Sequence, residues 1–143
     1  MRHYGVAFDE IRLPLDTPEF QLRIGRYSPT GKVPVLCLGG EIVWESLAIC
    51  EFVNERFLAG KAWPEDLRAR AAARCAAAEM HSGFPALRKQ LPMNCRRRPG
   101  IRHWDVHADA DIRRVQDVWR TFGERHAATE GFLVGRFGIV DAM

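Results

Sequence analysis

The chain has 143 residues, of which 47% are hydrophobic and 27% charged, and its formal net charge is +3. A chain of this length can bury a sizeable core as one domain or as two small ones, and its composition is ordinary for a globular protein. No apolar run approaches the roughly 18 residues of a membrane span, and residues 1–5 lack the apolar stretch of a signal peptide. We therefore expect a cytoplasmic protein with no membrane partner.

The first part of the chain predicts a strand and a short helix. Gly5 has the character of a helix stop, and residues 6–13 then roughly alternate between apolar and charged side chains, which favours a strand. Thr17 is a suitable N-cap with Pro18 at the first helical position, so we expect a helix from there to about Arg26.

A hairpin and an amphipathic helix are predicted next. Residues 33–38 form an apolar, β-branched run, Gly39-Gly40 is a hairpin turn signal, and residues 42–44 form the return strand. Strands joined this tightly must be antiparallel. Residues 46–57 then place their apolar side chains on one broad stripe, which predicts a helix that packs on the sheet.

A domain boundary is predicted at the short linker 60–64, which gives domains at 1–60 and 61–143. Beyond the linker the composition shifts to alanine, arginine and leucine, and a long helix is expected over residues 66–91. Its sequence Ser-Gly-Phe-Pro at 82–85 predicts a kink or a local break, because glycine and proline both disfavour a helix interior.

The last part of the chain predicts a second strong helix over residues 108–126. Its apolar stripe consists of Ile112, Val115, Trp119 and Phe122. Thr129-Glu130-Gly131 is expected to stop it. Residues 138–141 have the pattern of a further helix opening, but the chain ends at Met143, so we expect that helix to be absent.

Arginine supplies most of the positive charge, and its densest cluster is Arg96-Arg97-Arg98, followed by Arg102. This cluster could be a nucleic-acid-binding patch or a solvated loop. It is short and has no interleaved aromatic residues, so we favour the loop and expect no nucleic-acid partner.

The cysteines and histidines do not favour a metal site. Their spacing contains no C-x-x-C pair, and all but one cysteine lie in apolar sequence, so we expect buried, reduced thiols at Cys37, Cys50 and Cys75, with Cys95 beside the arginines. His103 and His107 would need a helix and further ligands to hold a metal, so a loop pair is favoured and no metal is expected.

Three motifs together resemble the cytosolic glutathione S-transferase family. They are Ser28-Pro-Thr-Gly-Lys-Val-Pro-Val-Leu, Trp44-Glu-Ser-Leu-Ala-Ile and Gly135-Arg-Phe-Gly-Ile-Val-Asp-Ala-Met. The resemblance covers most of the chain and is strongest over residues 9–58, while residues 79–84 are similar to a bacterial branch. It implies an α/β plus all-α fold, with a thioredoxin-like N-terminal domain followed by a helical C-terminal domain.

The resemblance also implies a glutathione site. Val33-Pro34 matches the family's cis-proline, where the Val33 backbone pairs with the cysteinyl unit of glutathione like an added strand. Glu45-Ser46 matches the pair that holds the γ-glutamyl end: the acid faces the ammonium, and the hydroxyl and helix N-terminus face the carboxylate. Lys32 would face the glycyl carboxylate.

Simpler interpretations exist for the same residues. Ser46 could be an N-cap and Glu45 an exposed acid at a strand end, although the spacing to Val-Pro favours the ligand interpretation. Met80, His81 and Phe84 could line an apolar pocket for the electrophile, but a kinked core helix explains them and is favoured.

The chain departs from the family at both ends. The family's first strand and most of its first helix have no counterpart, so the catalytic Ser, Tyr or Cys would lie upstream of Met1 and no residue here is assigned that role. The sixth helix would begin where the chain ends, and Gly138 replaces its usual Ser or Thr cap. We therefore expect a fragment, truncated at both ends and inactive by itself.

The function implied by the resemblance is conjugation of glutathione, as cosubstrate, to small electrophiles in detoxification. The full-length protein is expected to be a homodimer. Two alternatives remain: a non-catalytic binding or interaction module that keeps the fold, and a non-functional remnant.

Overall fold

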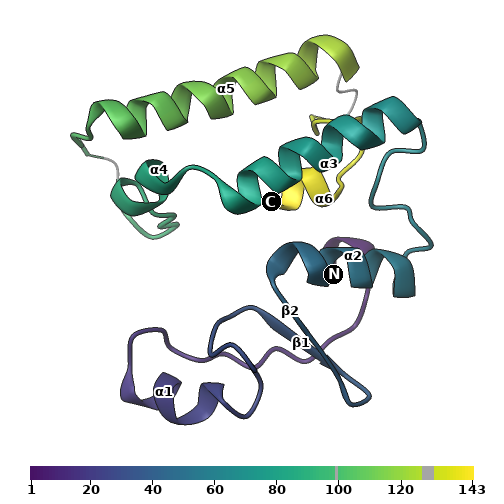
Figure 1. Cartoon of the computed structure of the whole chain (residues 1–143), viewed down its shortest axis with the longest axis vertical. Coiled ribbons are helices and arrows are strands. Elements are labelled where there is room, and N and C mark those ends of the chain that lie inside the picture. The colour runs from purple at the N-terminus through teal and green to yellow at the C-terminus, as the bar shows by residue number, and fades with distance from the viewer. Residues whose placement is uncertain (99, 127–130) are drawn as a thin grey trace. The chain divides into compact units, whose positions relative to one another are not determined.

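The computed structural model describes residues 1–98, 100–126 and 131–143. These residues form two compact units, Met1–Ala62 and Trp63–Met143. The first unit contains both strands and two α-helices, and the second is helical (Figure 1). In the part of the chain that the structure describes, no helix is both long enough and apolar enough to span a bilayer.

The first unit opens with a single 3-10 turn, Arg2–Tyr4, which ends as expected at Gly5 with a φ of 67°. The strand predicted over residues 6–13 is wrong, because this segment has no ladder partner among the described strands. Alternating side chains alone do not make a strand: its backbone groups need a neighbour with which to pair. Phe8 and Ile11 of this segment are exposed.

Helix α1, Pro18–Ile24, begins at the predicted residue and ends two residues before the predicted limit. The Thr17 hydroxyl accepts a hydrogen bond from the Phe20 N–H at 3.2 Å and donates one to the Pro14 carbonyl at 2.7 Å. The helix contributes Phe20 and Ile24 to the core of this unit. Its start was predictable because the cap is local in sequence.

The predicted hairpin is confirmed. Strand β1, Val35–Leu38, pairs antiparallel with β2, Glu41–Trp44, with Val35 opposite Trp44. Gly39 and Gly40 both have positive φ, 55° and 93°, as a two-residue hairpin turn that follows strand twist requires. Helix α2, Ser46–Phe57, packs against both strands (Figure 1).

A buried amide holds the end of the first unit. Asn54 of α2 is only 3% exposed, and its Oδ1 accepts a hydrogen bond from the Ala62 N–H at 2.8 Å. Ala62 is itself buried, so this N–H has no access to bulk water. The bond therefore satisfies two polar groups that burial would otherwise leave unpaired.

The second unit begins with helix α3, Leu67–Ser82, which is capped by the Asp66 carboxylate. The predicted break follows: Gly83 ends α3, Phe84 has a left-handed φ of 63°, and Pro85 opens α4, Pro85–Gln90. A Cβ on Gly83 would lie 2.6 Å from the Glu79 carbonyl oxygen, so the chain can turn closely here only because this residue has no side chain.

Helix α5, Val106–His126, starts two residues earlier than predicted. The Asp105 Oδ1 accepts hydrogen bonds from the N–H groups of His107 and Ala108, each at 3.0 Å. These hydrogen bonds lower the pKa of the Asp105 carboxyl, and the bond from the Ala108 N–H has the largest effect. The sequence analysis missed this cap. The predicted stop at Thr129-Glu130 lies outside the described residues.

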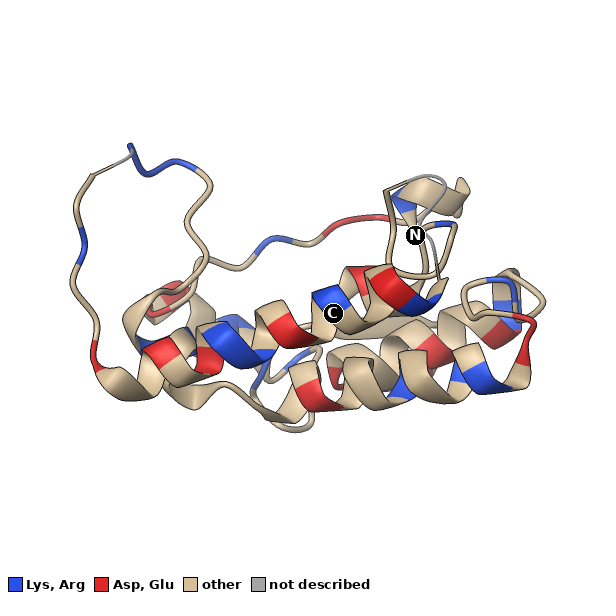
Figure 2. Ribbon diagram, turned by 90° about the horizontal axis from the view of Figure 1, so that it is seen from above, with Lys and Arg blue, Asp and Glu red and all other residues tan. Residues whose placement is uncertain are grey.

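Alanine and aromatic side chains form the core of the second unit. Helix α3 contributes a buried stripe at every fourth position, and α5 contributes a second one. The residues of these two stripes are Ala69, Ala73, Ala77, Ala108, Val115 and Phe122. Charged residues of both signs are spread over the long helices (Figure 2).

A short helix, α6, Ile139–Ala142, contacts α3, so the expectation that no helix forms after residue 138 is wrong. Asp141 explains how it forms in spite of the weak Gly138 cap. Its carboxylate accepts hydrogen bonds from the Leu133 and Gly138 N–H groups, each at 2.8 Å. Ile139 and Val140 are buried, and their burial adds to the stability of this turn.

The expected burial of the cysteines is wrong for Cys37 and Cys75. All are free thiols, but Cys37, Cys75 and Cys95 are exposed, and only Cys50 is half-buried. Cys75 lies on α3 away from its alanine stripe, which shows that an apolar neighbourhood in sequence does not decide which face packs. Burial raises the pKa of the Cys50 thiol, which disfavours its thiolate.

Candidate functional site

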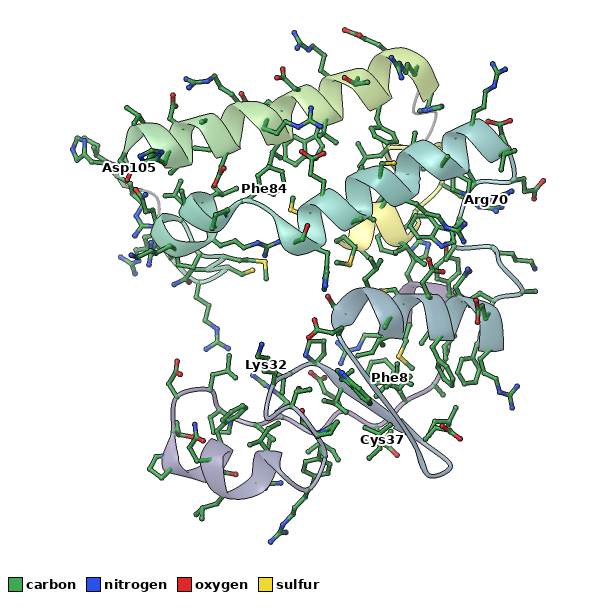
Figure 3. The ribbon with its side chains drawn as sticks, viewed as in Figure 1. Phe8, Lys32, Cys37, Arg70, Phe84 and Asp105 are labelled. Atoms are coloured by element: carbon green, nitrogen blue, oxygen red, sulfur yellow. The ribbon has the colours of Figure 1, made fainter. Side chains whose placement is uncertain are left out.

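The hairpin register defines the candidate site. Because Val35 lies opposite Trp44, the residues just before β1 and just after β2 emerge at the same end of the hairpin. That end carries all five predicted site residues: Lys32, Val33, Pro34, Glu45 and Ser46. Figure 3 shows Lys32 at this end, away from the hairpin turn.

The loop before β1 is shaped by a serine to which sequence reasoning gave no role. Ser28 is only 5% exposed, and its Oγ accepts a hydrogen bond from the Lys32 N–H at 3.1 Å. The same Oγ lies 3.2 Å from the Thr30 hydroxyl. Gly31 has a φ of 69°, which lets the chain turn between them. Ser28 thus positions the backbone that leads to Val33. In the sequence, a serine followed closely by proline and glycine was the pattern that could have indicated this turn.

The Val33 segment is accessible. Lys32, Val33 and Pro34 are all exposed, and they precede the first ladder residue, Val35. The Val33–Pro34 peptide bond is cis. An exposed backbone outside the ladder is the kind of edge to which an extended peptide can add.

The other half of the site is the start of α2. The structure assigns the N-cap to Glu45, which has a φ of 69°, and makes Ser46 the first helical residue, so the alternative of Ser46 as N-cap is wrong. Glu45 is exposed and Ser46 half-buried. The first turn of this 12-residue helix carries no acidic side chain, so its N–H groups present partial positive charge. This geometry suits a ligand with both an ammonium and a carboxylate.

A cavity, separate from the candidate site, lies within the helical unit. Its volume is about 550 Å³, and its lining includes Met80, Phe84, Val115, Trp119 and Phe137. His81 does not line it. Phe84 is 7% exposed, as a core residue would be, while Trp119 of the predicted apolar stripe is 57% exposed. The break after α3 therefore turns Met80 and Phe84 toward this largely apolar cavity.

An ion pair joins α3 and α5 at this cavity. The Arg114 Nε and a terminal nitrogen donate to the two Glu79 carboxylate oxygens at 2.5 and 2.7 Å. The Arg114 guanidinium lowers the pKa of Glu79. Since both side chains are partly exposed, the pair orients the helices more than it stabilises them.

The two histidines considered as metal ligands, His103 and His107, lie close to the beginning of α5. His107 is in the first turn of that helix, and His103 precedes it in the loop. Among residues 1–98, 100–126 and 131–143, no group of three His, Cys, Asp or Glu side chains is arranged to hold a metal ion.

Parts of the chain are similar to known proteins. Residues 1–56 match the family model described as "Glutathione S-transferase, N-terminal domain". The chain is 40% identical over 65 residues to dichloromethane dehalogenase of Methylorubrum extorquens, which covers 44% of this chain and 23% of that protein. It is 40% identical over 48 residues to the enzyme of the same name from Methylophilus leisingeri, covering 34% and 17%. The match thus spans less than a quarter of these curated relatives.

Solved structures resemble nearly the whole chain. Glutathione S-transferase 1-6 from Anopheles dirus species B superposes with a TM-score of 0.71 at 14% identity, over 96% of this chain and 64% of that one. A theta class glutathione S-transferase from Xanthomonas axonopodis pv. citri, solved with glutathione bound, gives 0.58 at 24% identity, over 98% and 68%.

These neighbours define the fold class as α/β plus all-α, a thioredoxin-like domain followed by a helical domain. The match of residues 1–56 and the two curated relatives make the first unit similar to the N-terminal domain of the glutathione S-transferase family.

Proposed function

We propose that the first unit binds glutathione at the end of the hairpin, and that the second unit is its helical partner domain. The observation that carries this proposal is the register of β1 and β2, which brings the Val33 segment and the Glu45-Ser46 segment to one end. A solved neighbour adds support, because the theta class protein from Xanthomonas axonopodis pv. citri has glutathione bound.

Each site residue has a matching group on the tripeptide. The Glu45 carboxylate pairs with the α-ammonium, and the Ser46 hydroxyl with the first N–H groups of α2 binds the γ-glutamyl carboxylate. The Val33 backbone pairs with the cysteinyl amide, and Pro34 fixes the chain at that point. The Lys32 ammonium faces the glycyl carboxylate.

The reaction class we propose is conjugation of glutathione to small electrophiles. In such a substitution the sulfur forms a bond to the electrophilic carbon, the bond to the leaving group breaks, and the thiol proton is released to solvent. A dihalomethane is the electrophile to test first, since both curated relatives are named dichloromethane dehalogenase. For this substrate the leaving group is halide.

Binding is tested by retention of the chain on immobilised glutathione. Glu45→Gln is expected to weaken binding about tenfold, because it removes one charge-assisted hydrogen bond. Glu41→Gln is the matched control: it removes the same charge from an exposed residue at the turn end of the hairpin, and binding should not change. Failure of the folded chain to bind, or equal losses in the two variants, would overturn the proposed site.

Turnover separates the enzyme from a non-catalytic binding module. Halide release from a dihalomethane and glutathione, and conjugation of an aromatic halide, are measured with the same preparation. Release that depends on both glutathione and protein supports conjugation. Retention on glutathione without turnover of either substrate instead assigns the chain the role of a non-catalytic binder.

Family-level properties complete the proposal. We propose a cytoplasmic protein that forms a homodimer and needs no metal. Light scattering during gel filtration gives the mass of the particle and so tests the dimer.

A further inference from the structure

The segment between α4 and α5 carries a dense positive charge that the glutathione site does not use. We call residues 92–98 and 100–104 the arginine loop. It contains Arg96, Arg97, Arg98 and Arg102 and no acidic residue. Figure 2 shows basic residues along this loop. The first acidic residue after it is Asp105, just before α5. All four arginines are exposed.

These arginines differ from three arginines of α5. Arg113, Arg114 and Arg120 of α5 each form an ion pair with an acidic side chain. Among the described residues, none of the four loop arginines has an acidic partner. Their charge is therefore not neutralised within the described chain and is available to an external anion.

Three of the side chains surround one hollow. Arg97, Arg98 and Arg102, with Gly100 and Ile101, line a concavity of about 380 Å³. A guanidinium offers several N–H donors in a plane that matches the oxygens of a phosphate group. The guanidinium groups of these three arginines therefore lie around one hollow, where a phosphate-bearing headgroup can bind. The run of arginines in the sequence did not by itself indicate this hollow.

Large apolar side chains accompany the arginines. Met93 is 93% exposed, Ile101 92% and Trp104 43%. Nucleic acid offers little for an exposed Met or Ile to contact, whereas the boundary between lipid headgroups and acyl chains accepts both apolar and aromatic side chains beside cationic ones. The mixture therefore favours a lipid surface over a nucleic acid.

We propose that the arginine loop docks the protein reversibly on an anionic phospholipid surface. The guanidinium groups bind headgroup phosphates, and Met93 and Ile101 enter the headgroup–acyl boundary. This peripheral mode needs no spanning helix. It replaces the expectation of no membrane partner, which rested on the absence of spanning and leader segments.

Co-sedimentation of the whole chain with vesicles tests this proposal. Vesicles that contain phosphatidylserine in phosphatidylcholine should bind the protein, and vesicles of phosphatidylcholine alone should not. The triple variant Arg96→Gln, Arg97→Gln, Arg98→Gln should lose about a hundredfold in partition coefficient, since each arginine near an anionic surface contributes about 1 kcal/mol, or roughly fivefold. Ile101→Ser should also weaken binding, and sodium chloride should abolish it.

A matched control distinguishes an effect of the arginine loop from an effect of the protein's net charge. Arg12, Arg26 and Arg68 are exposed, and the triple variant to Gln removes the same charge elsewhere. It should lose far less binding than the loop variant, and equal losses would overturn the proposal. Unchanged helical content by circular dichroism shows that each variant is folded, as expected for side chains exposed to solvent.

Two further outcomes would overturn the choice of ligand. Tighter binding to a single-stranded oligonucleotide than to anionic vesicles would assign the loop to nucleic acid. Displacement by inorganic phosphate beyond that caused by sodium chloride of equal ionic strength would assign it to a free phosphate. If phosphate acts only as a salt, the lipid surface is supported.

Discussion

The amide of Asn54 provides a sharp test of how the first unit is held together. In Asn54→Ala the Ala62 N–H loses the Asn54 Oδ1 as its hydrogen-bond acceptor, in a site where both residues are no more than 4% exposed. A buried donor left unsatisfied costs about 1–3 kcal/mol, so we expect the free energy of unfolding to fall by about that amount. Asn54→Asp keeps an acceptor oxygen and should preserve the bond.

Asn94 is the matched control. Its Oδ1 also accepts a backbone hydrogen bond, from the Arg96 N–H at 3.1 Å, but both residues are exposed. Water can replace the acceptor in Asn94→Ala, so a change within about 0.5 kcal/mol is expected.

Two measurements check the reasoning. Urea unfolding followed by circular dichroism gives the change in stability, and amide hydrogen exchange reports the Ala62 N–H directly. Exchange at Ala62 should accelerate in Asn54→Ala and stay slow in the Asn94 variant. Equal costs for the two alanine substitutions, or unchanged protection of Ala62 without its acceptor, would refute the argument that burial sets the cost.

Three further predictions concern the helical unit. Phe84→Ala should lower stability by about 3–5 kcal/mol in urea unfolding, because it removes a buried aromatic side chain beside an existing cavity. Because Arg114 lowers the pKa of Glu79, this carboxylate stabilises the fold above its unfolded pKa of about 4.3, and the contribution is lost as pH falls below it. Thermal melts of Glu79→Gln between pH 3 and 7 should therefore show a weaker pH dependence. Gly83→Ala should destabilise, because its Cβ would lie 2.6 Å from a backbone oxygen, whereas Gly123→Ala within α5 has open space and should stabilise by about 0.5–1 kcal/mol. Equal melting shifts for the two glycine variants would contradict the steric argument.

The cavity of the helical unit also affects the exposure of Trp119. Trp119 lies on the apolar side of α5 yet is 57% exposed, because it lines a cavity that no described side chain fills. Phe84→Ala should further expose Trp119, so the part of the tryptophan emission that this one of the four tryptophans contributes should shift to the red.

Much of the candidate site could be predicted from the sequence because its signals are local. The Gly39-Gly40 turn, the apolar residues beside it and the start of α2 lie within a few residues of each other, and turn geometry fixes the register. The break after α3 was predictable for the same reason, since Gly83 and Pro85 act on their own backbone. Ser28 was missed as a positioning residue because its role depends on burial.

The tertiary structure decided what local pattern could not. Residues 6–13 alternate like a strand but pair with none of the described strands, and pairing is a property of two segments. The exposure of Cys37 and Cys75 depends on which face of β1 and α3 is covered.

The turn at α6 shows the same division between sequence and structure. By itself the sequence determined the order of the hairpin, the helices and their breaks, because caps, turns and periodicity act over a few residues. From the sequence, Gly138 is a poor cap for this turn. The fold compensates, because it brings the Leu133 N–H within 2.8 Å of the Asp141 carboxylate, eight residues away. Burial, register partners and such non-local hydrogen bonds exist only once the chain has packed, since they depend on distances in space rather than along the sequence.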